Sequence, residues 1–141
     1  MQTNTKILLA EDDPLQAESI AALARGCLPD ADVRWYGSEH AFLLEVESGT
    51  LAQWNPNFAI IDLRIRYYAL QELRGVATPN FESLGKAAGA GVRCRDALAK
   101  ICPNTKTAIL TVMEDNPGGC VIKKGDGDYK EELAAFLKCR S

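Results

Sequence analysis

The chain has 141 residues, a formal net charge of −3 and an isoelectric point near 5.2. This length suits one domain with a substantial core, and the acidic balance argues against nucleic acid as a direct partner. No apolar run is as long as a membrane span. The sequence has one histidine, and its five cysteines lack CxxC spacing, so it contains no zinc-ligand set. Because the amino terminus lacks the apolar core of a signal peptide, we expect a cytoplasmic protein whose cysteines are reduced and buried.

The first part of the chain predicts a strand followed by a helix. A short apolar run indicates a strand at residues 6–10, and an amphipathic stretch indicates a helix over residues 14–25. Asp13 is expected as the N-cap of this helix, since a short acidic side chain can accept from the free amides of the first turn. Gly26 is expected to end the helix.

The remaining elements continue the alternation of strands and helices. In chain order we expect a strand near residues 32–36, a helix at 38–48, a strand at 58–63, a helix near 92–101, strands at 107–112 and 121–124, and a last helix from Asp128. Strands that alternate with helices predict a parallel sheet that is covered on both faces.

Two stretches depart from this alternation. Residues 64–90 are long for a strand-to-helix connection and contain a Gly/Ala-rich run, so we expect an inserted loop or helix segment that acts as a mobile cover or partner surface. Only eight residues, 113–120, separate the last two strands, which leaves little room for a helix. We still expect a parallel last strand, because eight extended residues can return along a short strand.

Acidic residues follow two of the apolar strands. Asp62 lies at the end of the strand at residues 58–63, and Glu11, Asp12 and Asp13 follow the first strand. Ligands of such sheets bind beyond the carboxyl ends of the strands, where these acids are expected to meet. Carboxylates that lie close together repel each other unless a cation compensates them. The pattern therefore indicates a divalent-metal site for phosphate chemistry.

Four segments, taken in order, form a further pattern: Ile7-Leu-Leu-Ala-Glu-Asp-Asp-Pro14, Ala59-Ile-Ile-Asp62-Leu63, Ala108-Ile-Leu-Thr111 and Val121-Ile-Lys-Lys124-Gly125. Together they resemble the receiver domain of bacterial two-component response regulators. The first is similar to the family's first strand and acid pair, the second to its phosphoacceptor strand, the third to the fourth strand with its switch hydroxyl, and the last to the fifth strand with its lysine. The resemblance implies a single receiver domain over residues 1–141, flavodoxin-like, with a doubly wound five-stranded parallel sheet of order 2-1-3-4-5 and a reduced fourth helix.

The resemblance also implies roles for individual residues. Asp62 would accept a phosphoryl group, Lys124 would pair with a phosphoryl oxygen, and the Thr111 hydroxyl would close onto the modified site. Mg²⁺ would be held by Asp12, Asp62 and the Arg64 carbonyl directly and by Glu11 through water. Lys123 is an alternative to Lys124, because adjacent strand residues point in opposite directions; Gly125 after Lys124 favours the latter.

The function implied is that of a phosphorelay receiver. It would take its phosphoryl group from a histidine kinase or phosphotransfer protein and signal to an effector protein or output domain, and it could form a homodimer. It would accept and release the group autocatalytically without turning over an external substrate. One alternative is a degenerate receiver that binds a protein without phosphorylation, as the shortened 113–120 link would favour. A phosphatase-like Mg²⁺ hydrolase is a further alternative, but it would usually need an acid where Arg64 stands.

Overall fold

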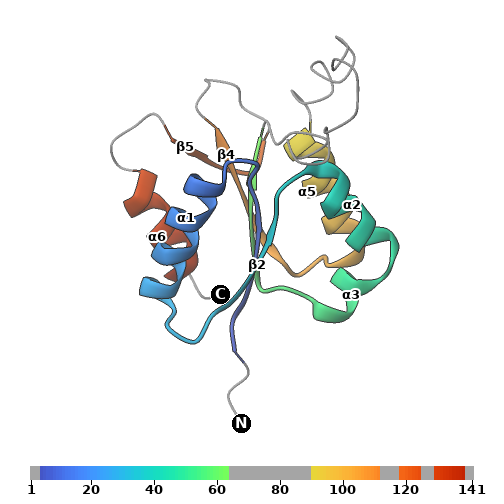
Figure 1. The fold of residues 1–141 in the computed structure, drawn as a ribbon, viewed down its shortest axis with the longest axis horizontal. Coiled ribbons are helices and arrows are strands. Elements are labelled where there is room, and N and C mark those ends of the chain that lie inside the picture. Colours follow the sequence, from blue (N-terminus) through green and yellow to red (C-terminus); the bar gives the residue numbers. More distant parts are fainter. Residues whose placement is uncertain (1–3, 64–89, 112–117, 125–128, 139–141) are drawn as a thin grey trace.

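The computed structural model describes residues 4–63, 90–111, 118–124 and 129–138 (Figure 1). Its five strands form one sheet in the order β2-β1-β3-β4-β5, and every neighbouring pair is parallel. The strands are β1 (Lys6–Ala10), β2 (Asp32–Tyr36), β3 (Phe58–Asp62), β4 (Lys106–Thr111) and β5 (Cys120–Lys123). The predicted fold class and strand order are therefore confirmed, including the parallel direction of β5.

Helices cover both faces of the sheet (Figure 1). The helices α1 (Pro14–Cys27) and α6 (Tyr129–Lys138) lie on one face, and α2 (Glu39–Glu47), α3 (Thr50–Trp54) and α5 (Ala90–Ile101) lie on the other. Of the helices described, none combines the length and apolar composition that crossing a bilayer needs. The expected insertion at residues 64–90 lies outside the described residues except for Ala90, and so does most of the 113–120 link.

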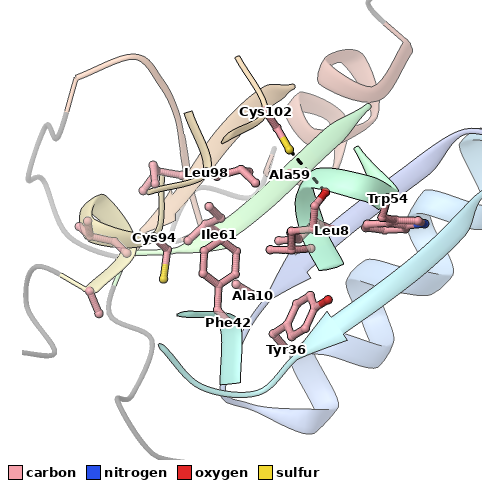
Figure 2. Packing of buried hydrophobic residues seen from close by; sticks show 14 residues of the cluster. Leu8, Ala10, Tyr36, Phe42, Trp54, Ala59, Ile61, Cys94, Leu98 and Cys102 are labelled. Atoms are coloured by element: carbon pink, nitrogen blue, oxygen red, sulfur yellow. Dashed lines mark hydrogen bonds between the residues drawn. The ribbon is translucent and has the colours of Figure 1, made fainter. Parts of the chain in front are cut away.

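Alternation along the central strands divides the core into two layers. Leu8, Ala59 and Ile61 face α2, α3 and α5 (Figure 2), whereas Leu9, Ile60 and Leu110 face α1 and α6. All five residues of β3 are buried, as expected for a parallel strand covered on both faces. This burial fixes the register of the sheet and therefore the level at which each strand ends.

Several expected boundaries were wrong. The first helix does not end at Gly26, because the Leu28 amide donates to the Ala24 carbonyl at 2.8 Å and extends the helix to Cys27. The helix expected from residue 92 begins at Ala90, which is buried. The sequence also did not predict α3, a five-residue helix that is too short to show an amphipathic period.

The expectation of buried cysteines holds only in part. Cys94 and Cys102 are buried, Cys27 is partly buried and Cys120, on the edge strand β5, is exposed, whereas Cys139 lies outside the described residues. The Cys102 Sγ donates to the Leu51 carbonyl at 3.5 Å, which links α3 to the end of α5 (Figure 2).

Candidate functional site

The candidate site lies beyond the carboxyl ends of the central strands. In register, Asp62 of β3 pairs with Leu110 of β4, and Ala10 of β1 pairs with Ile61. Backbone hydrogen bonds continue the ladder past the strand ends: the Glu11 amide donates to Tyr36 O at 3.1 Å. The residues that carry the acidic groups therefore have fixed backbone positions.

Three carboxylates meet at this edge. One oxygen each from Glu11, Asp12 and Asp62 lie within 4.8 Å of one another. Glu11 is 1% exposed and Asp62 is 8% exposed, whereas Asp12 is partly exposed. Hard carboxylate oxygens grouped in this way suit a small divalent cation such as Mg²⁺. The sequence placed these three acids at one sheet edge, and the structure brings them together.

Lys124 brings an ammonium group to these acids. Its Nζ lies 3.5 Å from Asp62 Oδ1 and 3.4 Å from Glu11 Oε2, and its side chain is 11% exposed. The Lys124 amide donates to the Thr111 carbonyl at 2.7 Å, which holds the residue just after the end of β5. Lys123 is exposed. Of the two lysines that the sequence left open, the structure therefore places Lys124 at the acids.

Crowding of the acids perturbs Glu11. Burial, together with the nearby charge of Asp62, raises the pKa of the Glu11 carboxyl to about 8, although Lys124 and the backbone amide of Asp13 oppose the rise. A divalent cation would offset the repulsion among these crowded carboxylates, so the residues present fit Mg²⁺.

The other predicted residues have different positions. Thr111 ends β4 at the same sheet edge and is 2% exposed. Arg64 lies outside the described residues. Asp13 caps α1 as predicted, because its Oδ1 accepts from the Leu15 amide at 3.0 Å. The Asp13 side chain is exposed and its carboxylate caps the helix. It is not one of the three grouped acids.

Sequence reasoning missed two residues that support the site. The Trp35 indole Nε1 donates to the Glu11 carbonyl at 2.7 Å. The Gly91 amide donates to the Leu63 carbonyl at 2.9 Å, directly after Asp62. Both contacts are made to backbone atoms, so no pattern of side-chain types could have indicated them; a glycine near a helix start was the only signal for Gly91.

No protein-family model and no curated protein matches this sequence. Among solved structures, the chain is similar to a response regulator receiver domain protein from Bacillus halodurans, with 16% identity, a TM-score of 0.61 and coverage of 99% of this chain and 100% of that one. It also matches the N-terminal domain of a response regulator/sensory box/GGDEF 3-domain protein from Carboxydothermus hydrogenoformans, with 17% identity, a TM-score of 0.62 and coverage of 95% and 91%.

A third match is the isolated REC domain of RcsB from Salmonella enterica in the presence of phosphomimetic BeF3⁻. The identity is 14% and the TM-score 0.60, with coverage of 99% of this chain and 92% of that one. Identities this low show the fold alone. The chain has the fold of the response regulator receiver domain.

Proposed function

We propose that residues 1–141 form a phosphoacceptor receiver domain in which Asp62 takes a phosphoryl group from a phosphohistidine of a histidine kinase or phosphotransfer protein. The observation that carries the proposal is the position of the Lys124 ammonium, 3.5 Å from Asp62 Oδ1 within a cluster of three acids, on a receiver fold. A lone strand-end aspartate would not need these neighbours, whereas a group that must accept a highly charged phosphoryl group does.

The transfer is a substitution at phosphorus. An Asp62 carboxylate oxygen attacks the phosphorus atom, a P–O bond forms, and the P–N bond to the donor imidazole breaks with its electron pair passing to the nitrogen. The product is an acyl phosphate on Asp62. Lys124 already lies beside Asp62 and pairs with a phosphoryl oxygen as a compact positive charge.

In this proposal the three acids form a Mg²⁺ site. Asp12, Asp62 and the Arg64 carbonyl would hold the ion, with Glu11 acting through water. When bound there, Mg²⁺ would supply positive charge to offset that of the transferred phosphoryl group. Glu11 is well placed for an indirect role, because its Oε1 already accepts from the Asp13 amide at 3.2 Å and its Oε2 lies near Lys124.

Signalling would use Thr111 as the responding group. Its hydroxyl belongs to the strand that pairs with β3, and it lies at the same edge as Asp62. Closure of this hydroxyl onto a phosphoryl oxygen would move the chain that follows β4 and report the modification to an effector protein or output domain. Such a receiver works in the cytoplasm, and residues 64–90 would be an insertion beside its site.

The direct test is intact mass after incubation with acetyl phosphate and Mg²⁺. We expect wild-type protein to gain one phosphoryl group that is labile to hydroxylamine, and Asp62→Asn to gain none. Asp13→Asn is the matched control, because it removes a neighbouring carboxylate that only caps α1 and replaces it with another good capping residue. This variant should be modified like wild type.

Two results would contradict the proposal. Full modification of Asp62→Asn would show that the nucleophile is elsewhere. If wild-type protein remains unmodified under conditions in which it is folded and Mg²⁺ is present, the alternative of a receiver that binds proteins without phosphorylation would replace the proposal.

A further inference from the structure

The first turn of α5 touches the backbone that carries Asp62. A Cβ atom on Gly91 would lie 2.5 Å from Leu63 Cα and 2.6 Å from the Asp62 carbonyl oxygen. The Gly91 amide donates to Leu63 O, and the Leu63 amide donates to Leu110 O at 2.8 Å. The Leu63 peptide is therefore held between β4 on one side and α5 on the other. Any shift of α5 would be passed to the backbone of Asp62.

An ion pair between partly exposed Arg93 and buried Glu39 holds this same turn of α5 against α2. Arg93 Nε donates to Glu39 Oε2 at 2.7 Å and Arg93 Nη2 donates to Oε1 at 2.9 Å, a two-point contact that fixes both position and orientation. The Glu39 side chain is 1% exposed and that of Arg93 is 43% exposed. Burial raises the pKa of the neighbouring Cys94 thiol to about 12, so that thiol adds no charge at neutral pH.

The Glu39 end of the pair is tied to the other half of the site. Glu39 is the first residue of α2, directly after the N-cap Ser38, whose Oγ accepts from the Ala41 amide at 3.1 Å. The chain enters this cap from Tyr36, whose carbonyl accepts from the Glu11 amide. The pair therefore spans the gap between the segment next to Glu11 and the turn that contacts the Asp62 backbone.

We propose that Glu39 and Arg93 are positioning residues that set the separation between the Glu11 and Asp62 carboxylates. The inference rests on the proposed function of this site, and it adds a determinant of metal affinity that lies outside the acidic cluster. Neither Glu39 nor Arg93 is among the three acids that would hold the ion. Their effect passes through the α2 cap on one side and through Gly91 and Leu63 on the other.

The test compares Mg²⁺ affinity and local amide exchange in Arg93→Met, Arg93→Lys and wild type. Isothermal titration with MgCl₂ should show a dissociation constant about 10-fold higher for Arg93→Met, the scale seen when groups that orient metal ligands are removed. Arg93→Lys keeps the charge but not the two-point geometry, so its constant should fall between the two. Should Arg93→Met fail to fold, Arg93→Lys still tests the inference.

The matched control is Leu137→Ala, a fully buried position in α6 on the opposite face of the sheet. It destabilises the protein without touching α2 or α5, so its Mg²⁺ affinity should equal that of wild type. Hydrogen exchange by NMR supplies a readout that does not depend on metal. Relative to wild type, exchange in the Arg93 variants should accelerate more at the Leu63 and Gly91 amides than at the Ile60 amide. Leu137→Ala should show no such local acceleration.

The outcomes separate the two proposals. Wild-type affinity and unchanged exchange at Leu63 and Gly91 in both Arg93 variants would overturn the positioning role while the proposed function stands. Equal loss of affinity in Leu137→Ala would also overturn it, since general destabilisation would then be the cause. If wild-type protein binds no Mg²⁺, the proposed function fails, and the inference falls with it unless the local exchange response is still present.

Discussion

Replacement of Glu11 by glutamine should stabilise the metal-free protein at alkaline pH. Glutamine keeps the shape of the side chain and an oxygen that can accept from the Asp13 amide, but it removes a charge that is buried beside Asp62. Burial raises the pKa of Glu11 from 4.5 to about 8, so the folded protein binds a proton there that the unfolded chain has already released. Wild-type stability should therefore fall as pH rises between these two values.

The size of the effect follows from the two pKa values. Each pH unit inside this window costs the wild type about 1.4 kcal/mol relative to Glu11→Gln, which sums to an upper limit of about 5 kcal/mol above pH 8. Local rearrangement and water penetration around the ionised carboxylate lower this figure, so a difference on the order of 2–5 kcal/mol is expected. For a domain of this size each kcal/mol corresponds to about 2–4 °C in melting temperature.

Thermal and urea unfolding from pH 4 to pH 9 in EDTA measures the difference directly. The curves of wild type and Glu11→Gln should meet near pH 4.5 and separate steadily up to pH 8. Saturating Mg²⁺ stabilises the folded wild type by mass action and favours ionised Glu11, so the gap should shrink when it is added. Parallel curves across the whole range would refute the assignment of a protonated, crowded Glu11.

Two further predictions test the surroundings of the site. Gly91→Ala should lower the free energy of unfolding, measured in urea, by about 1–3 kcal/mol, because the new Cβ would meet the Leu63 backbone at 2.5 Å. The control is Gly26→Ala in α1, whose Cβ would meet no described atom within 4 Å. It should raise the free energy of unfolding by up to about 1 kcal/mol. Lys124→Met should slow phosphoryl uptake from acetyl phosphate by about 100-fold, the scale of losing one donor that stabilises charge in the transition state. Lys123→Met, at an exposed position, should leave the rate unchanged. Equal rates for the two variants would show that Lys124 does not act in the site.

Local sequence patterns were enough to predict the strands and the helix cap. The cores of β1 and β3 are short apolar runs, and burial on both faces of a parallel sheet leaves few other positions for such runs. Asp13 precedes a proline and a helical stretch, which is a local signal that does not depend on the rest of the fold. The alternation of elements then brings the ends of β1 and β3, and hence Glu11, Asp12 and Asp62, to one edge.

Only the tertiary structure determined how that edge is supported. Glu39 and Arg93 are 54 residues apart, and either could have been an ordinary surface charge until helix packing brought them together. The contact of Gly91 with Asp62 and Leu63 depends on the distance between α5 and the end of β3, which no local pattern encodes. Gly125 favoured Lys124 over Lys123 in the sequence, but the position of Lys124 depends on the register of β5, which ends one residue earlier than the predicted strand. Periodicity reports which face of an element is buried, whereas these contacts depend on where separate elements meet in space.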